Sequence, residues 1–234
     1  MEMIAETGKS RLKRGGTMSD RVARHQIREE IQRRILSGET QPGERLSQQS
    51  LARELGVAQG TVRESLFELQ WLGLVESIDR LGVFVGKLDV ERICQAYQVR
   101  AVLEGLAARL SCNNAGRADI VTLRGMAEDI YKLAKKEKED ERGHLDRDFH
   151  FYIIKLSRNN ILIRLAESYR VLGMTVRASR EQQRILDEHL AIVDAIEKNN
   201  ADEAERLARL HVTEAARRIE ADAQQGNFVP RWVD

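Results

Sequence analysis

The chain has little proline and little cysteine, and each shortage excludes a class of structure. Two prolines among 234 residues leave long stretches free to form helices. The high shares of alanine, leucine, glutamate and arginine also favour helix over strand. Cys94 and Cys112 are too few for a disulfide framework, as is usual in a reducing compartment. We therefore expect a mainly α-helical protein.

A long apolar run and a strong net charge are also missing. No apolar segment approaches the roughly 18 residues of a membrane span, and no charged-then-apolar signal peptide opens the chain. We therefore expect a cytoplasmic protein that has no membrane partner. The formal net charge is +1, so any surface that binds nucleic acid must be a local patch.

The segment from Ser47 to Leu72 has the pattern of a helix-turn-helix. A short helix over about 48–55 precedes a turn at Gly56. A second helix begins near residue 58, and its apolar residues recur at helical spacing. Its outward polar side chains gather near its start: Gln59, Thr61, Arg63 and Glu64. This arrangement is typical of a helix that enters the major groove of DNA.

The flanking segments complete a winged helix-turn-helix over residues 19–86. A first helix, capped by Ser19 or Asp20 and ending near residue 36, carries a stripe of isoleucines. Two β-prone runs, 74–78 and 82–85, predict a hairpin with a basic tip. Residues 1–18 lack apolar periodicity and are interpreted as a disordered arm, or alternatively as a basic arm that contacts phosphates.

The pattern is helical throughout residues 90–225, which predicts an all-helical bundle of six to seven helices. The expected helices are 90–112, 117–138, 141–157, 160–178, 180–198 and 201–224. Asn159 and either Asn199 or Asn200 are expected to cap the helices that follow them. The domain boundary is expected within 86–89, and residues 226–234 form a tail.

Three histidines are predicted to point into this bundle from separate helices. His150 follows Asp146 by four residues, so the two side chains share one helix face. His189 and His211 are flanked by apolar residues one turn away. One such histidine would best be explained as a satisfied core residue. Three of them with an aspartate instead suit a borderline divalent metal held between facing helices.

Arg100 is a second unusual residue on an apolar helix face, with Glu104 one turn along. A buried arginine is costly unless it is paired. The two residues could form a purely structural pair. Arg100 could also hold an anionic ligand, because a guanidinium binds a carboxylate with two parallel hydrogen bonds.

Two sets of segments resemble one family of bacterial regulators. The stretch ILSGETQPGERLSQQSLARELGVAQGTVRESLFELQWLGLVE, followed by GVFV, resembles the winged helix of GntR-type transcription regulators. The segments RAVLEGLAARL, LDRDFHFYII, EHLAIVDAI and RLARLHV, together with Asn159, resemble the helical effector domain of the FadR branch, called FCD. Together the matches cover about residues 20–222 in the family's order.

The resemblance implies which residues contact DNA. These positions are Arg45, Gln59, Thr61 and Arg63, with Gly82 in the wing beside the minor groove. Relatives often carry arginine where this chain has Gln59. If Gln59 contacts a base, glutamine favours adenine over guanine.

The resemblance also implies a metal and an effector site. The D-x-x-F-H motif selects Asp146 and His150 over the offset pair of His144 and Asp148. The implied metal ligands are Asp146, His150, His189 and His211. We expect them to bind Zn²⁺ or Ni²⁺, with Mn²⁺ and Fe²⁺ as the alternatives. The residues implied to bind the effector are Arg100, Tyr97 and Arg177.

These observations predict a transcription regulator rather than an enzyme. We expect a homodimer that binds a near-palindromic operator on double-stranded DNA, with repression the commoner mode in the family. A small carboxylic acid bound at the metal would modulate its affinity for DNA. The alternatives are a metal-dependent hydrolase and a metal-sensing regulator without an organic effector.

Overall fold

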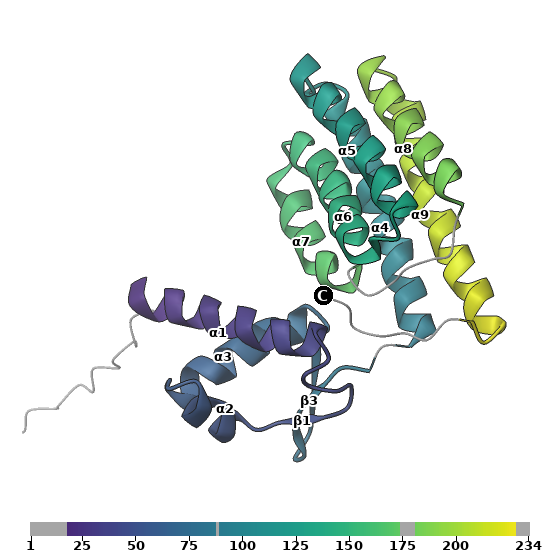
Figure 1. The fold of residues 1–234 in the computed structure, drawn as a ribbon. Helices are drawn as coiled ribbons and strands as arrows, with labels where there is room; N and C mark the ends of the chain where they lie inside the picture. The colour runs from purple at the N-terminus through teal and green to yellow at the C-terminus, as the bar shows by residue number, and fades with distance from the viewer. Residues whose placement is uncertain (1–17, 88, 174–180, 228–234) are drawn as a thin grey trace, which may run out of the picture.

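The computed structural model describes residues 18–87, 89–173 and 181–227, without the side chains of 18–23 and 167–173. Helices and a small sheet form an N-terminal part, and helices alone form the C-terminal part (Figure 1). Residues 1–17 of the expected arm and residues 228–234 of the expected tail lie outside the described residues, whereas Met18 of the expected arm belongs to the first helix. No helix within the described ranges is long and apolar enough to cross a membrane.

The N-terminal part is a winged helix-turn-helix, as predicted. Its elements are α1 (Met18–Leu36), β1 (Arg45–Leu46), α2 (Gln48–Glu54), α3 (Gln59–Trp71), β2 (Val75–Ile78) and β3 (Gly82–Val85). The strands form one antiparallel sheet in the order β1-β3-β2. Gly56 takes a φ of +66° between α2 and α3, a conformation that glycine adopts without steric cost.

Two local predictions in this part were wrong. Helix α1 begins at Met18, so Ser19 and Asp20 lie inside the helix rather than at its cap. The sequence predicted two strands only, but Arg45 and Leu46 pair with β3 as a third strand. A strand of two residues has no periodicity of its own, and only its pairing with Phe84 and Val83 reveals it.

The isoleucine stripe of α1 packs on the helix-turn-helix. Ile27, Ile31 and Ile35 are buried together with the apolar face of α3, which includes Val62, Leu66 and Leu69. Burial of such side chains contributes about 1.5–3 kcal/mol each. This packing fixes α3 on the domain and leaves its polar N-terminal residues at the surface.

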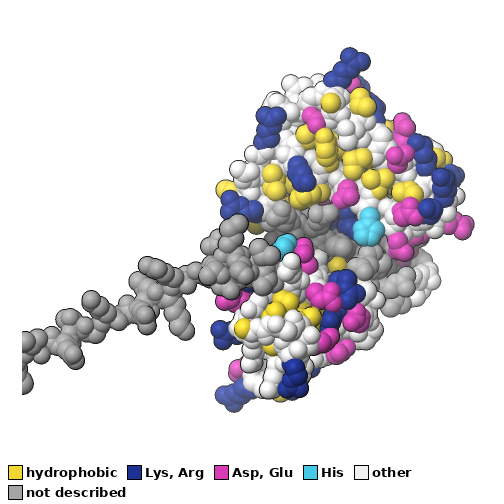
Figure 2. Space-filling model, turned by 60° about the vertical axis from the view of Figure 1, so that its left-hand side comes forward, with side chains coloured by type: hydrophobic (Ala, Val, Ile, Leu, Met, Phe, Trp, Pro, Cys, Tyr) yellow, Lys and Arg dark blue, Asp and Glu magenta, His cyan; other side chains and the backbone are white. Residues whose placement is uncertain are grey.

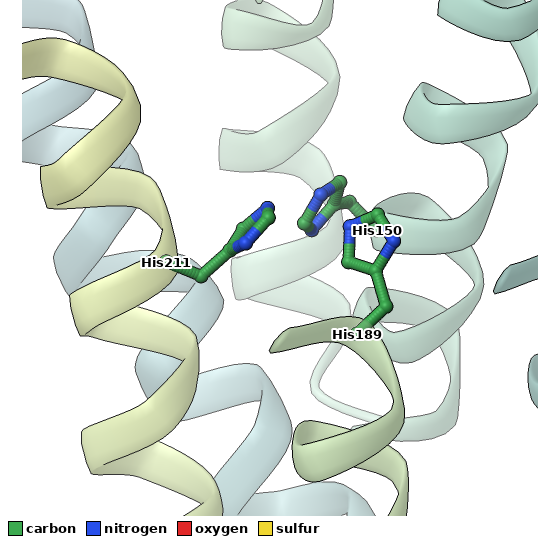
Figure 3. Close-up of side chains that lie close together, drawn as sticks. All are labelled: His150, His189 and His211. Atoms are coloured by element: carbon green, nitrogen blue, oxygen red, sulfur yellow. The ribbon is translucent and has the colours of Figure 1, made fainter. Parts of the chain in front are cut away.

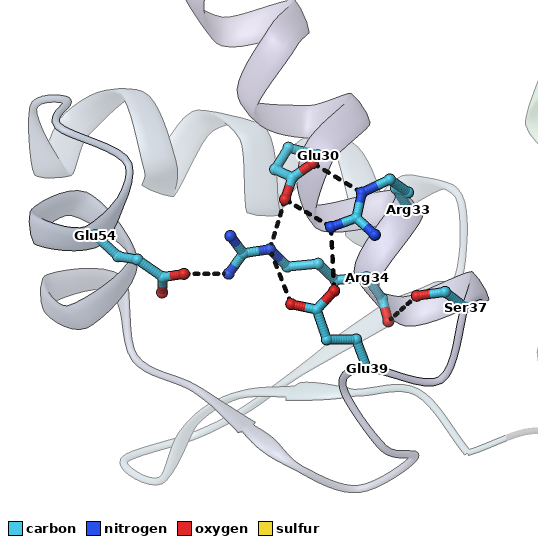
Figure 4. A network of polar contacts seen from close by, with 6 residues as sticks. All are labelled: Glu30, Arg33, Arg34, Ser37, Glu39 and Glu54. Atoms are coloured by element: carbon cyan, nitrogen blue, oxygen red, sulfur yellow. Dashed lines mark hydrogen bonds and ion pairs between the residues drawn. The ribbon is translucent and has the colours of Figure 1, made fainter.

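A polar network joins the C-terminal end of α1 to α2 (Figure 4). Glu30 accepts hydrogen bonds from Arg33 and Arg34, and Arg34 also donates to Glu54 of α2 at 2.7 Å. Arg33 donates to Glu39 in the turn that follows α1. The two guanidinium groups lower the pKa of Glu30 from 4.5 to about 2.

The C-terminal part is a bundle of helices, as predicted. They are α4 (Val90–Ser111), α5 (Arg117–Lys135), α6 (Glu139–Leu156), α7 (Asn160–Gly173), α8 (Gln182–Glu197) and α9 (Ala201–Gln224). Helix α4 packs against α6, α7, α8 and α9, and it lies most extensively along α9. The predicted extension of the fourth of these helices to residue 178 falls partly in 174–180, outside the described residues.

The helix ends agree with the predicted caps. The Asn159 side chain accepts hydrogen bonds from the backbone N–H groups of Ile161 and Leu162 at the start of α7. Asn200 caps α9, whereas Asn199 before it takes a φ of +53°. These caps satisfy backbone donors that would otherwise have no partner in the first turn of each helix.

Candidate functional site

Three histidines from three helices meet inside the bundle (Figure 3). His150 belongs to α6, His189 to α8 and His211 to α9. Their relative exposures are 8%, 0% and 7%. One ring nitrogen from each lies within 4.8 Å of the others. The structure therefore brings together the three histidines that the sequence singled out.

Asp146 lies beside this histidine cluster. Its Oδ1 is 3.5 Å from His189 Nε2, and its Oδ2 is 3.9 Å from His150 Nε2. Ligand atoms about 2.1 Å from one metal ion lie roughly 3–3.5 Å apart in tetrahedral or octahedral geometry. The side chain is 32% exposed, so the site has an open side at this carboxylate. The two Asp146 separations are close to this range, whereas the histidine nitrogens, up to 4.8 Å apart, would move closer together around a bound metal.

Two further carboxylates lie behind the histidines. Glu104 Oε2 of α4 is 2.9 Å from His150 Nδ1, and Glu188 Oε2 of α8 is 2.8 Å from His211 Nδ1. In metalloproteins such carboxylates fix the ring orientation and tautomer of a ligating histidine. Both contacts engage Nδ1, which leaves Nε2 of each ring for a metal.

Sequence reasoning missed this role of both glutamates. Glu104 was assigned only to Arg100, and Glu188 was not singled out. Each contact joins residues of two different helices, 46 residues apart for Glu104 and His150 and 23 for Glu188 and His211. Helical periodicity shows which face a residue occupies, but it does not show which helix packs there.

His189 provides the strongest fit to a metal. Both of its ring nitrogens are buried without a hydrogen-bond partner among the described residues. Such atoms cost about 1–3 kcal/mol each when left unpaired. Burial, together with the nearby His211, holds the pKa of His189 well below its usual value. The ring is therefore neutral, which is the form that binds metals.

The charge at the site also suits a cation. Burial alone would raise the pKa of Asp146, but the surrounding histidines outweigh this effect and lower it. Burial would likewise raise the pKa of Glu104, and Arg100 and His150 lower it instead. Both carboxylates are therefore ionised at neutral pH. Burial would lower the pKa of His150, but Glu104 raises it, so a metal bound at this ring would displace its proton. The three imidazoles and the carboxylate then form a donor set for Zn²⁺, Ni²⁺, Mn²⁺ or Fe²⁺.

Arg100 points inward, next to the histidine cluster. Its Nε donates to Glu104 Oε1 at 2.9 Å, and its guanidinium carbon lies 4.5 Å from the centre of the Tyr97 ring. The ion pair that the sequence offered as a structural explanation is thus present. A role in effector binding for Arg100 and Tyr97 remains a prediction. Arg177 lies outside the described residues.

The N-terminal turn of α3 presents the polar residues expected at DNA. Gln59 and Arg63 are exposed and Thr61 is half-buried, while Val62 between them is fully buried. The side chain of Arg45 lies against Gly82, where an added Cβ would be 3.3 Å from Arg45 Nε. The unpredicted β1–β3 pairing therefore places Arg45 on the wing.

Charged side chains of both signs are intermixed on the face shown in Figure 2. Positive and negative groups lie close together over much of that face. This agrees with the net charge of +1 and with ion pairs such as Arg24 to Glu64 at 3.1 Å. This net charge predicts little long-range attraction to DNA.

These features define a class: a winged helix-turn-helix protein with a second, helical domain that holds a buried polar site. Residues 23–85 match the family described as bacterial regulatory proteins, gntR family, and residues 95–214 match the FCD domain. The chain therefore belongs to the GntR family of bacterial regulators and carries an FCD domain. The helix-turn-helix of this family implies DNA binding, and FCD domains are associated with metal-binding effector sites.

Curated relatives of similar length are named as transcription regulators. The probable D-xylose utilization operon transcriptional repressor of Paenarthrobacter nicotinovorans is 30% identical over 191 residues, which are 80% of this chain and 84% of that protein. The Glc operon transcriptional activator of Escherichia coli K12 is 26% identical over 233 residues, with 88% and 92% covered. One is a repressor and the other an activator, so similarity alone does not fix the sign of regulation.

Solved structures support the fold. Escherichia coli McbR/YncC matches with a TM-score of 0.64 and 19% identity, covering 88% of this chain and 99% of that one. A GntR regulator from Rhodococcus sp. RHA1 matches with a TM-score of 0.62 and 23% identity, covering 89% and 100%.

Proposed function

We propose that this chain is a homodimeric transcription regulator whose affinity for a near-palindromic operator is controlled by a small carboxylic acid. The acid binds beside a divalent metal held by Asp146, His150, His189 and His211. The observation that carries this proposal is the buried histidine cluster with an inward-pointing arginine, in the same chain as a winged helix-turn-helix.

The DNA-binding half of the proposal rests on α3 and the wing. The exposed polar residues at the start of α3 suit the edges of bases and the adjacent phosphates. Arg45 and Gly82 come together on the wing, where a basic side chain suits the phosphate backbone or the minor groove. A two-fold dimer would present two such surfaces to the two halves of an operator.

The effector half rests on charge and position. A bound divalent metal supplies a Lewis-acidic site that accepts a carboxylate oxygen. The Glu104 carboxylate lies between Arg100 and His150. The guanidinium of Arg100 can donate hydrogen bonds to the carboxylate of an acid that is bound to the metal. Asp146 marks the partly exposed side by which a small molecule would enter. An acid that binds one dimer geometry more tightly than another shifts the population toward that geometry. The operator fits only one of the two geometries, so the acid changes the affinity for DNA.

A second function has one observation in its favour. Arg100 already pairs with Glu104, as a purely structural pair requires. In that case the metal itself would be the signal, or it would only stabilise the bundle, and no organic acid would act. The two proposals differ in whether DNA affinity responds to acids at constant metal.

The test begins with an operator selected from random duplex DNA by the protein itself. Fluorescence anisotropy then gives the Kd of the Zn²⁺-loaded protein for this DNA with acetate, lactate, succinate or malate. At least one acid should shift the Kd by about 5- to 150-fold, the usual range of allosteric coupling. DNA binding that follows Zn²⁺ and ignores every acid would instead support the metal sensor, and turnover of an acid would support an enzyme.

Arg100→Met is the decisive variant for the effector. It keeps much of the side-chain volume but removes the cation. Without acid its Kd for the operator should stay within about threefold of the wild-type value, since α3 is unchanged. The active acid should then shift this Kd by less than about twofold. An unaltered response would leave Arg100 with only its structural pair.

A further inference from the structure

We infer that Glu104 is a positioning residue that couples the Arg100 site to the metal site through His150. The inference rests on the proposed function, because it concerns how the two halves of that site communicate. In this role one buried carboxylate orients a metal ligand. The same carboxylate also responds when Arg100 binds an anion.

The geometry of Glu104 supports this role. Its Oε1 accepts from Arg100 Nε at 2.9 Å, and its Oε2 lies 2.9 Å from His150 Nδ1, an ion-pair distance without the alignment of a hydrogen bond. The residue is 7% exposed, and its side chain comes from α4, whereas His150 belongs to α6. One buried carboxylate therefore contacts both the guanidinium of Arg100 on its own helix and the imidazole of His150 on the neighbouring helix.

The chemistry requires a carboxylate at this position. A carboxylate accepts hydrogen bonds at both oxygens, so it can receive Arg100 and the Nδ1–H of His150 together. A glutamine offers one acceptor and one donor group, and the donor would face either a guanidinium or an N–H. Glutamine can therefore satisfy Arg100 or His150, but not both.

Glu188 offers a matched control within the same site. It contacts His211 Nδ1 at 2.8 Å, as Glu104 contacts His150. Its arginine neighbour, Arg184, is 60% exposed, whereas the Arg100 side chain is 15% exposed and lies beside the histidine cluster. Both glutamates should orient a metal ligand, but only Glu104 connects a ligand to Arg100.

The experiment is a double-mutant cycle read out as Zn²⁺ affinity, measured with Zn²⁺ alone against a chromophoric chelator. Glu104→Gln and Glu188→Gln should each weaken Zn²⁺ binding by about 10- to 100-fold. Arg100→Met, which removes no ligand, should also weaken Zn²⁺ binding, because Glu104 loses one of its two anchors. This effect of Arg100→Met should vanish in the Glu104→Gln background and persist in the Glu188→Gln background.

Three outcomes would overturn the inference, and the measurements distinguish them from one another. If the effects of Arg100→Met and Glu104→Gln on Zn²⁺ affinity are additive, Glu104 does not transmit between the two sites. If Glu104→Gln lowers the melting temperature of the metal-free protein but leaves the Zn²⁺ affinity within threefold, the residue is structural. If the wild-type protein binds no Zn²⁺, Ni²⁺, Mn²⁺ or Fe²⁺, the proposed metal site itself fails and the inference fails with it.

Discussion

At the scale of single residues, the environment of His189 favours a role as a metal ligand. The ring is fully buried beside Phe149, with ring centres 4.4 Å apart, and neither nitrogen has a hydrogen-bond partner in the described structure. A core histidine kept only for packing would normally donate and accept at least one hydrogen bond. A metal on Nε2 would satisfy the nitrogen that already faces Asp146 Oδ1 at 3.5 Å.

The double substitution of His189 and His211 by alanine should abolish metal binding. It removes two of four proposed ligands, and the remaining aspartate and histidine form a weak two-ligand site. Elemental analysis after dialysis against buffered Zn²⁺ should give less than a tenth of the wild-type metal content. His144→Ala is the control, because His144 is an exposed histidine of the same helix as His150. Full occupancy in the double variant would exclude the site.

The candidate site was only partly predictable at this scale. Asp146 and His150 share a helix, and their spacing of four residues alone places both on one face. The three histidines could be assigned to the interior from their apolar flanks. The contact between Glu188 and His211 joins α8 to α9, so it depends on helix packing that no local pattern contains. The contact between Glu104 and His150 could not be predicted for the same reason.

At the scale of secondary-structure elements, the helices were predictable and the smallest strand was not. Long stretches with few prolines and periodic apolar residues define α4 to α9 to within a few residues of their observed ends, except around 174–180. Helices α5 and α6 meet at Lys136 to Lys138, inside a run of charged residues. Glu137 there takes a φ of +57°, and the charged residues on both sides remain at the surface.

The α1–α2 network predicts a pH-dependent contribution to stability. The folded pKa of Glu30 is about 2 and its reference value 4.5, so the carboxylate stabilises the folded state fully above pH 4.5. This contribution is lost as the pH falls towards 2. A third of the Glu30 side chain is exposed, so Glu30→Gln should cost about 1 kcal/mol at pH 7, less than the pKa shift alone implies.

Urea unfolding followed by far-UV circular dichroism measures this cost. The gap between Glu30→Gln and the wild type should narrow between pH 7 and pH 3. Glu29→Gln is the control on the same helix, because Glu29 is 59% exposed and pairs only with an exposed histidine at 3.0 Å among the contacts described. It should change stability by less than about 0.5 kcal/mol at either pH. A constant gap for Glu30→Gln would show that the network adds no pH dependence.

At the scale of the whole molecule, the charge balance limits how this protein can bind DNA. A chain with a net charge of +1 gains little from long-range attraction, so under the proposed function its affinity comes from a few contacts at α3 and the wing. In a dimer each of these contacts occurs twice. The loss of one such arginine should therefore have a large effect, although the net charge of each chain changes by only one unit.

Arg63→Ala tests this view on the selected operator. If Arg63 contacts a phosphate, the slope of log K against log salt should fall by about 0.9 for each chain, or about 1.8 for the dimer. If it contacts a base, the affinity should fall by about 1–3 kcal/mol for each contact with an unchanged slope. Arg206→Ala removes the same charge from an exposed arginine of α9 that pairs with Glu203, and it should leave both quantities unaltered. Equal effects of the two substitutions would mean that the general charge of the protein, and not the recognition helix, determines binding. Unchanged affinity and slope in Arg63→Ala would remove this residue from the DNA-binding face.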